Sequence, residues 1–458
     1  MSHVADGMRS ISPESDVDVV RRLAHICGLG FTRAAGPADE VGGAPARWVA
    51  APATASAVGA VLRTAADHDL TVVPRGAGTK LDWGAAPTQL DIVLDTGRLA
   101  GIHRWSRQEQ TVEVGAGTPL RAVQAALGKH GHRLAVDVRS VDATVGGVLA
   151  TNEVGPLCHR HGTPGDQVMG VSYVDAAGVP THAGGWAAGE SPGYDLARLL
   201  CGSYGALGVL VSATLRVRPV PARRLWVSRP VWTPWEMHTL VGEILATPLA
   251  PAAIELDLPA DLDLSAAPGP PAAPGRPVDS GWAAARRSHS GPPAGSLTIL
   301  LEGDSAEVTT HAARLRRLLG DRAEATDSPP PWWQRYPFGP DDIALRIAVP
   351  VGDLHAAVYA LRDAVGAPVP VRGAAGLGVV YAVLPPRTPP HRVAAILAAM
   401  RGVLLARDGS CVVVTAPPAV RRSVDLWGAL PDLSARRRIK EHFDPYRRLA
   451  PGRYPGDS

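Results

Sequence analysis

The sequence predicts an α+β protein with two domains. Between Trp48 and Pro221, short apolar runs typical of strands alternate with helix-period segments, and glycine-rich turns separate them. From Ser296 to Thr415 the alternation resumes in a form that indicates an antiparallel sheet covered by helices. A stretch rich in Pro, Gly, Ala and Ser at 266–294 has no apolar period, so we expect a flexible insertion there.

The first region contains strands and helices in a definite order, after a start whose composition indicates a frayed terminus. Pro74 should stop the strand before it. Thr118 and Pro119 can open a helix as its N-cap and first helical residue. Side chains from Val209 to Val217 alternate between apolar and polar, which indicates a strand with one buried face. Helices are expected near 17–28, 58–66 and 118–127, and strands at 71–73, 91–94, 111–114, 168–174 and 209–217.

The second region has the same two kinds of element. Its helices recur between strands of five to seven residues, which favours a sheet with helices packed on it. Helices are expected near 237–245, 306–319, 354–365, 393–400 and 434–442, and strands at 297–301, 343–349, 378–384 and 411–415. The chain therefore divides into a partly disordered N-terminal segment with a short helix (1–44), a first domain (45–221), a second domain (222–442) and a tail (443–458).

Composition argues against several classes of protein. The 458 residues carry a net charge of only +3 with no basic block, so we expect no nucleic-acid partner. No apolar run approaches the roughly 20 residues that span a bilayer, and the first residues lack a secretory signal pattern. The four cysteines are far apart, which indicates reduced thiols in the cytoplasm rather than disulfides or a zinc site.

Four glycine-rich turns lie in the first region, at 74–79, 115–117, 146–147 and 202–208. A glycine-rich loop after a strand lets backbone N–H groups approach a phosphate, and Arg75 could add a positive charge. A single glycine pair is most often a plain turn, but four such turns indicate a large phosphate-bearing ligand. Leu81 stands where a Rossmann fingerprint needs its third glycine, and there is no P-loop signature, which disfavours a Rossmann-bound nicotinamide or a nucleoside triphosphate.

These turns resemble motifs of the FAD-binding PCMH-type (vanillyl-alcohol oxidase-like) flavoproteins. The segment 72–79 resembles the family's pyrophosphate loop, and 112–120 resembles the segment that follows it. The segments 143–152 and 193–209 resemble two further flavin-contacting stretches, and 443–453 resembles the family's usual ending. The continuation Lys80-Leu81-Asp82-Trp83-Gly84 is most similar to the glycolate oxidase FAD-binding subunit.

The resemblance implies a two-subdomain FAD-binding domain, an antiparallel-sheet cap domain, and a tail that returns to the FAD domain. Family members that attach FAD covalently carry a histidine where this chain has Thr79, so the resemblance implies non-covalent FAD. The backbone at 75–79 would hold the diphosphate. The implied cofactor-binding residues are Pro74, Arg75, Gly76, Ala77, Gly78, Thr79, Gly117, Ala143, Thr144, Gly146, Gly147, Asn152, Gly205, Gly208 and Val209.

Candidates for catalysis come from outside the glycine turns, and the catalytic base itself is not identified. His159 and His161 could transfer a proton beside the flavin, because imidazole titrates near neutral pH. Arg372 could clamp a carboxylate or form only a salt bridge. Trp332 and Trp333 could cap a substrate pocket or dock a partner, although core packing is favoured.

Three departures from the family pattern bear on metal and chemistry. Related D-2-hydroxyacid dehydrogenases look metal-assisted, through histidines in one stretch of the cap domain. The stretch of this chain that resembles it, 372–378, has no His, Asp or Glu, so no metal is expected. Gly189-Glu190 replaces the usual lysine-asparagine, and Ala450 replaces the usual asparagine near the tail. These changes leave the flavin-binding loops intact and alter residues expected near the isoalloxazine ring of the flavin.

Together these features predict an FAD-dependent oxidoreductase that oxidises a small 2-hydroxyacid such as glycolate by hydride transfer to the flavin. The alternative is a non-catalytic FAD-binding or electron-relay subunit of a glycolate oxidase-like complex. An iron–sulfur protein or a sister flavoprotein subunit would be its partner, because the chain has no Cys-x-x-Cys run of its own. A flavin-free binding scaffold is the third hypothesis.

Overall fold

The computed structural model describes residues 13–185, 196–260, 295–385, 387–430 and 432–455. The chain forms two compact units. The first contains the residues up to Val220 and those from Ala429 onward, and the second runs from Pro221 to Gly428. Both units combine helices with open sheets, which confirms the predicted α+β class.

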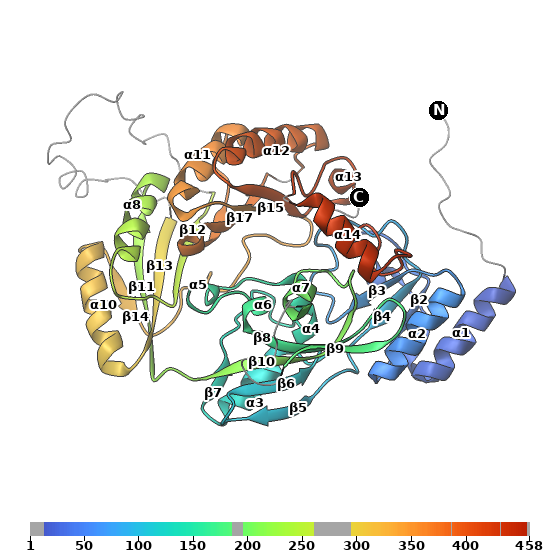
Figure 1. The fold of residues 1–458 in the computed structure, drawn as a ribbon. Helices are drawn as coiled ribbons and strands as arrows, with labels where there is room; N and C mark the ends of the chain where they lie inside the picture. The colour runs from blue at the N-terminus through green and yellow to red at the C-terminus, as the bar shows by residue number, and fades with distance from the viewer. Residues whose placement is uncertain (1–12, 186–195, 261–294, 386, 431, 456–458) are drawn as a thin grey trace. The chain divides into compact units, whose positions relative to one another are not determined.

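The first unit contains a four-stranded sheet with strand order β1-β2-β4-β3 (Figure 1). Strands β2 and β3 run parallel to β4, and β1 pairs antiparallel with β2. Two helices, α1 and α2, pack apolar side chains such as Leu23 and Val58 against Ile92 and Leu94 of this sheet. The bounds are β1 Thr32–Ala34, β2 Trp48–Ala50, β3 Val72–Arg75, β4 Ile92–Asp95, α1 Pro13–Cys27 and α2 Ala55–Asp67.

A second, antiparallel sheet in the same unit has the order β5-β6-β10-β8-β9, and β7 pairs with β10. Apolar residues of β6, β8 and β10 form one core with helices α3 and α4. The two sheets agree with the expectation of two subdomains. The bounds are β5 Ile102–Ser106, β6 Thr111–Gly115, β7 His132–Leu134, β8 Val168–Val174, β9 Pro180–Gly184, β10 Val209–Pro219, α3 Leu120–Gly128, α4 Val145–Thr151, α5 Cys158–His161, α6 Pro164–Gln167 and α7 Leu196–Leu200.

The last helix, α14 (Leu433–Phe443), belongs to the first unit, although the sequence-based boundary at residue 442 placed it in the second domain. The side chain of Lys440 explains the difference. Its Nζ is buried and donates hydrogen bonds to the carbonyl oxygens of Ala206 (2.9 Å) and Leu449 (2.7 Å) and to Asp444 Oδ2 (2.7 Å). Beyond the helix, the Ala450 N–H donates to the Val72 carbonyl, so the tail lies along β3.

The second unit is built on an eight-stranded sheet of order β14-β11-β13-β12-β16-β17-β15-β18, in which every neighbouring pair is antiparallel. Helices α8, α10, α11 and α12 pack on it or on one another. The bounds are β11 Arg223–Val231, β12 Ala253–Leu258, β13 Gly295–Gly303, β14 Glu324–Thr326, β15 Ile343–Ala348, β16 Val371–Ala374, β17 Val379–Leu384, β18 Ser410–Thr415, α8 Pro234–Leu245, α10 Ser305–Leu319, α11 Leu354–Val365, α12 Pro390–Leu405 and α13 Pro418–Arg421.

Two local predictions were wrong. The strand at β3 continues through Pro74 to Arg75. Helix α3 starts at Leu120 with Pro119 as its N-cap, and the Thr118 hydroxyl instead accepts a hydrogen bond from the Gly101 N–H (2.9 Å). The expected insertion at 266–294 and most of the expected frayed start lie outside the described residues. None of the helices in the described segments has the length and hydropathy of a bilayer span.

Candidate functional site

A cleft lies beyond the carboxyl end of β3. It consists of two adjoining hollows of about 500 and 420 Å³ that share six lining residues, so they form one continuous space. Eleven of the fifteen predicted cofactor-binding residues line the cleft. The shared residues are Pro74, Arg75, Gly76, Gly147, Ala150 and Tyr204.

The loop after β3 presents backbone donors to this cleft. Among the described residues, the N–H groups of Gly76, Ala77, Gly78 and Thr79 have no hydrogen-bond acceptor. Gly78 has φ +78°, a conformation that favours glycine. Successive N–H groups in a tight turn can bind an anion such as a phosphate. The chemistry of this donor set therefore fits the diphosphate of a dinucleotide cofactor.

Helix α4 forms the opposite side of the cleft. Its first N–H groups are already used within the protein, because Val145 N donates to the Thr118 carbonyl and Gly146 N to the Ala116 carbonyl. Gly147 lines both hollows, and a Cβ on it would meet only Thr144 Oγ1, at 3.3 Å. The absence of a side chain at Gly147 therefore keeps this part of the cleft open.

Several predicted cofactor glycines are required by packing within the protein. A Cβ on Gly76 would lie 2.1 Å from Thr144 Oγ1, one on Gly117 would lie 2.0 Å from the Thr96 carbonyl oxygen, and one on Gly208 would lie 2.7 Å from Tyr173 Cδ2. These glycines let neighbouring segments approach closely. The predicted residues outside the cleft lining are Gly117, Ala143, Asn152 and Val209.

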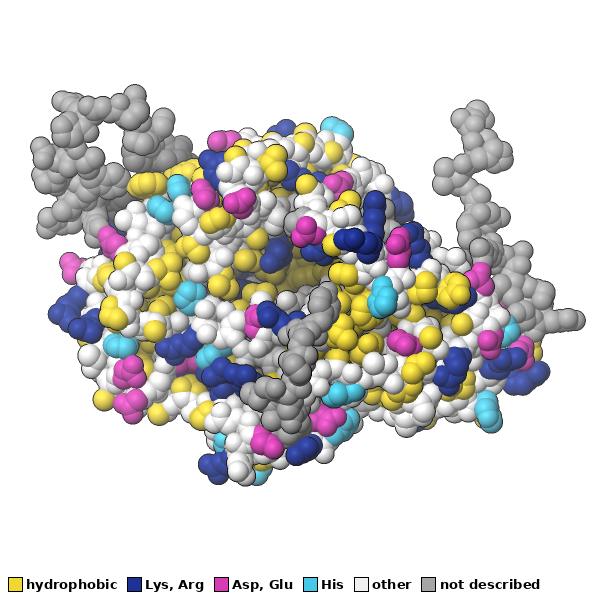
Figure 2. Space-filling model, viewed as in Figure 1, with side chains coloured by type: hydrophobic (Ala, Val, Ile, Leu, Met, Phe, Trp, Pro, Cys, Tyr) yellow, Lys and Arg dark blue, Asp and Glu magenta, His cyan; other side chains and the backbone are white. Residues whose placement is uncertain are grey.

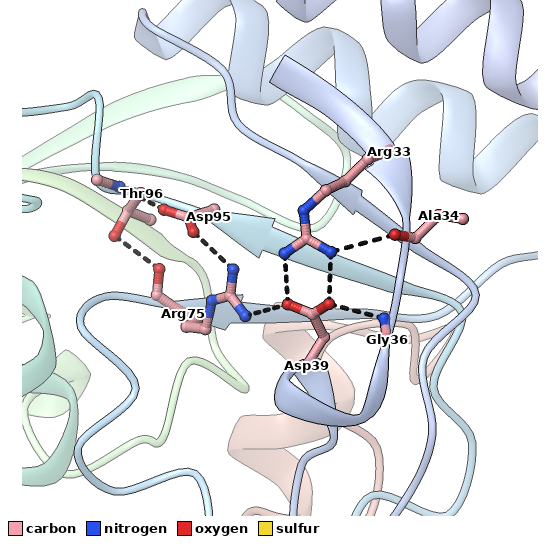
Figure 3. Close-up of polar contacts among 8 residues, drawn as sticks. Arg33, Ala34, Gly36, Asp39, Arg75, Asp95 and Thr96 are labelled. Atoms are coloured by element: carbon pink, nitrogen blue, oxygen red, sulfur yellow. Dashed lines mark hydrogen bonds and ion pairs between the residues drawn. The ribbon is translucent and has the colours of Figure 1, made fainter. Parts of the chain in front are cut away.

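The side chain of Arg75 does not supply the free charge that the sequence suggested. Figure 3 shows its guanidinium between Asp39 and Asp95, with Nη1 2.6 Å from Asp39 Oδ1 and Nη2 2.7 Å from Asp95 Oδ2. Asp39 is buried and also accepts two hydrogen bonds from Arg33, at 2.6 and 2.8 Å. The Arg33 hydrogen bonds, with those from the Gly36 N–H and Arg75, hold the pKa of Asp39 well below its usual range.

This network predicts how stability depends on pH. Because the pKa of Asp39 is lower in the folded chain than in the unfolded chain, its contribution is complete above about pH 5, begins to fall near the unfolded-state pKa of about 4, and is lost as pH falls through the much lower folded-state pKa. We expect Asp39→Asn to weaken this acid dependence, measured as the free energy of urea unfolding at pH 7, 4, 3 and 2. Asp142→Asn, at a side chain that is 72% exposed, is the control. Parallel pH curves for the parent and Asp39→Asn would contradict the assignment.

Two further cations hold the loop that follows the glycines. Lys80 is buried, forms an ion pair with Glu153, and donates a hydrogen bond to Ser140 Oγ (2.8 Å). Burial lowers the pKa of Lys80, and the Glu153 carboxylate opposes that shift. Arg453 donates to the carbonyl oxygens of residues 81 and 83 (3.1 Å each) and residue 85 (3.2 Å). The loop is thus fixed from both sides of the cleft.

Lys80, Tyr204 and Arg453 line the cleft but were absent from the predicted site. All three lie inside the motifs that carried the family resemblance, so the motifs contained the signal. The guanidinium of Arg453 lies 6.0 Å from the centre of the Tyr204 ring, within the range of a cation–π contact. Tyr204 adopts φ +55°, and its N–H donates to the Ala150 carbonyl (2.8 Å).

The catalytic candidates do not meet in this cleft. His159 and His161 lie on the short helix α5 and are not among the lining residues. Arg372 lies on β16 in the second unit, where its Nε donates to Asp257 Oδ1 (2.7 Å) and its Nη1 to the Tyr336 carbonyl (3.4 Å). Of the two roles considered for Arg372, the salt bridge is the one present. Gly189-Glu190 lies outside the described residues.

The tryptophan pair and the candidate metal ligands lie as follows in the described residues. Trp333 is buried and packs edge-on against Trp226, with ring centroids 6.3 Å apart, as expected for core packing. Within the described part of the chain, no three His, Cys, Asp or Glu side chains come close enough together to hold a metal ion.

Residues 46–184 match the FAD binding domain family. Among curated proteins, the chain is similar to a D-lactate dehydrogenase of Archaeoglobus fulgidus (32% identity over 207 residues; 45% of this chain and 46% of the relative). It is also similar to the glycolate oxidase subunit GlcE of Escherichia coli (33% over 156 residues; 34% and 43%) and to a D-2-hydroxyglutarate dehydrogenase of Xanthomonas citri (34% over 174 residues; 38% and 37%). These matches span less than half the length of each relative.

Two solved structures share the fold across nearly the whole chain. One is p-cresol methylhydroxylase with substrate bound (TM-score 0.70, 15% identity, 97% of both chains). The other is 4-ethylphenol oxidase from Gulosibacter chungangensis (TM-score 0.69, 16% identity, 98% of both chains). At these identities the likeness concerns the fold alone.

Proposed function

We propose that this chain is an FAD-dependent oxidoreductase that acts on a small 2-hydroxyacid. Its residues 46–184 form a PCMH-type FAD binding domain, as the sequence predicted. Glycolate is the proposed substrate, and the proposed site for non-covalent FAD is the cleft between the 76–79 loop and α4. The observation that carries this proposal is the row of N–H groups without acceptors, from Gly76 to Thr79, at a cleft that the predicted cofactor-binding residues line.

The names of three relatives support the substrate class. D-lactate dehydrogenase, D-2-hydroxyglutarate dehydrogenase and glycolate oxidase are all named for 2-hydroxyacids. Each of those compounds carries a hydroxyl group beside a carboxylate. Bound FAD supplies a two-electron acceptor for such a carbon centre.

In this proposal the chain's own residues bind and orient the cofactor. The 76–79 N–H groups hold the diphosphate, and Thr79, in place of a histidine, leaves the cofactor non-covalent. Gly147 and Ala150 leave room for the flat part of the ligand, while Lys80 and Arg453 fix the loop that borders it. His159 and His161 remain proposed proton-transfer groups, and Arg372 a proposed carboxylate contact.

An anaerobic titration tests the activity. The purified FAD-bound chain is mixed without oxygen with glycolate, D-lactate, L-lactate or D-2-hydroxyglutarate, and its flavin absorbance is followed. We expect at least one of these acids to bleach the flavin, with D-lactate preferred over L-lactate because the matched lactate enzymes are named for the D form. No bleaching by any of them, in a chain that dithionite does bleach, would contradict direct 2-hydroxyacid oxidation.

A second function is favoured by two observations. Two of the relatives, GlcD and GlcE, are named as subunits of glycolate oxidase, and Arg372 is already paired with Asp257. We propose as the alternative an FAD-binding electron-relay subunit that works only beside an iron–sulfur protein or a sister flavoprotein. The proposed location is the cytoplasm, where cysteine thiols stay reduced. Bleaching only after such a partner is added would establish the alternative.

A further inference from the structure

Three arginines lie on one face of the antiparallel sheet in the first unit, near the end of β10. Arg216 and Arg218 are two positions apart on this strand, so their side chains share a face. Arg133 of β7 lies directly opposite Arg218 in the ladder, and Thr111 of β6 lies opposite Arg216. Residues paired in this way have Cβ atoms about 4.5–5.5 Å apart. Figure 2 shows Lys and Arg side chains at the surface over β7.

Carboxylates do not offset the charge of the two arginines on β10. Within the described segments, neither of these side chains forms an ion pair or a hydrogen bond. The acidic residues in and between β5 and β6 have other neighbours: Glu109 lies 3.7 Å from Arg104, and Glu113 accepts a hydrogen bond from Ser212 Oγ (3.0 Å). The positive charge at the end of β10 is therefore not neutralised by its own sheet.

The ladder places like charges opposite each other at this point. Burial, and then the nearby charges of Arg216 and Arg133, lower the pKa of Arg218. Arg133 is only 8% exposed and has polar contacts of its own, so it contributes here as a fixed positive charge. Like charges directly opposite in a ladder destabilise the strand pair. A bound anion would remove this repulsion.

Two buried polar atoms beside the arginines have no hydrogen-bond partner. Thr111 is 0% exposed, and its Oγ1 makes no hydrogen bond in the described part of the chain. The same holds for Arg218 Nε, which is buried although the guanidinium is partly accessible. Buried polar groups in folded proteins nearly always have a partner, and an exception indicates an ion or another group that belongs at the place.

The donor set suits an oxyanion. A guanidinium binds carboxylate or phosphate oxygens through two parallel N–H···O bonds, and a hydroxyl adds a further donor. A phosphate group has three strong acceptor oxygens and a charge of about −1.5 to −2 at pH 7, so it matches several positive charges better than a single carboxylate does. None of the four residues lines the proposed FAD cleft.

We propose that Arg216, Arg218 and the Thr111 hydroxyl form a binding site for a phosphate group, separate from the FAD cleft. The ligand is inorganic phosphate or a small phosphorylated molecule. Arg133 strengthens the local positive potential from β7. Because the anion binds only where β6, β7 and β10 are assembled, its binding stabilises the folded chain.

Thermal unfolding of the FAD-saturated chain in increasing inorganic phosphate measures the affinity, with NaCl adjusted to keep the ionic strength constant. Bound FAD keeps phosphate out of the proposed diphosphate site. We expect Arg218→Gln to weaken phosphate binding about tenfold or more, and Thr111→Val about three- to tenfold, because hydrogen bonds to charged groups are the stronger ones. Arg121→Gln on α3, where the side chain is 69% exposed, is the matched control and should bind phosphate as the parent does.

Stability in phosphate-free buffer separates a ligand site from a structural contact. Arg218→Gln removes one of two opposed charges, and Thr111→Val replaces a hydroxyl that has no partner by a methyl group. Both variants should therefore be at least as stable as the parent without phosphate, and less stable than the parent in saturating phosphate. Residues that only held the sheet together would lower the stability equally under both conditions.

Glycerol 3-phosphate and acetate identify the ligand. Tighter binding of glycerol 3-phosphate than of phosphate would support a phosphorylated small molecule, and equal or weaker binding would support free phosphate. Four results would overturn the proposal: no stabilisation of the parent by phosphate, equal stabilisation of Arg218→Gln and Arg121→Gln, equal stabilisation of the parent by acetate and phosphate, or a loss of stability in Arg218→Gln and Thr111→Val that is the same with and without phosphate.

Discussion

A leucine in place of Gly147 is expected to lower the affinity of the chain for FAD by roughly a hundredfold or more, about 2.7 kcal/mol, while the chain remains folded. A Cβ at this position meets only Thr144 Oγ1, at 3.3 Å. Because Gly147 lines both hollows of the cleft, the new side chain would extend into the cleft. The affinity is measured by titrating FAD onto the apoprotein and following the quenching of flavin fluorescence.

Gly242→Leu is the control for this variant. Gly242 is also a helical glycine with open space around it, but it lies on α8 in the second unit and does not line the cleft. Its replacement should leave FAD affinity unchanged and should stabilise α8 slightly, by about 0.5–1 kcal/mol. Equal FAD affinity in Gly147→Leu and Gly242→Leu would show that FAD binds somewhere other than this cleft.

The largest effect on stability is expected for Lys440→Met. This change removes three hydrogen bonds at once and leaves the buried Asp444 carboxylate without its cation. Breaking a buried ion pair by removing one partner costs about 3–5 kcal/mol. The free energy of urea unfolding at pH 7, followed by circular dichroism, measures the loss.

Two further variants identify the cause. Lys129→Met, at an exposed lysine after α3, should change stability by less than about 0.5 kcal/mol. Lys440→Met combined with Asp444→Asn should recover part of the loss, because no buried charge is then left alone. A Lys440→Met chain as stable as Lys129→Met would mean that Lys440 does not join α14 and the tail to the first unit.

Much of the fold follows from local pattern. The strand predicted at 168–174 is β8, which is a short and largely buried run ended by a turn, and the helix predicted at 354–365 is α11, whose period-3.6 pattern coincides with its buried face. Short elements such as β5, whose residues are mostly exposed, carry little pattern and were not predicted. The assignment of α14 to the first unit depends on contacts of Lys440 with Ala206, 234 positions earlier, which no local pattern contains.

The same distinction applies to the site. The order of glycine turns along the chain predicted which segments surround the cleft, because each turn adjoins a strand or a helix. Side-chain partners from distant segments could not be predicted. The sequence suggested that Arg75 could add a positive charge, but not that its guanidinium would pair with Asp39 and Asp95, which lie 36 and 20 positions away. The atoms that exclude a side chain at Gly117 and Gly208 belong to Thr96 and Tyr173, and the sequence could not predict these contacts.

The central claim is that the cleft of the first unit holds FAD without a covalent bond, and one measurement tests it most directly. The purified chain is examined for flavin absorption, precipitated with acid, and the FAD released into the supernatant is quantified per chain. We expect a yellow protein that releases about one FAD per chain and rebinds it on refolding, because Thr79 offers no covalent attachment. A colourless chain that takes up no added FAD, or flavin that stays entirely with the precipitate, would contradict it.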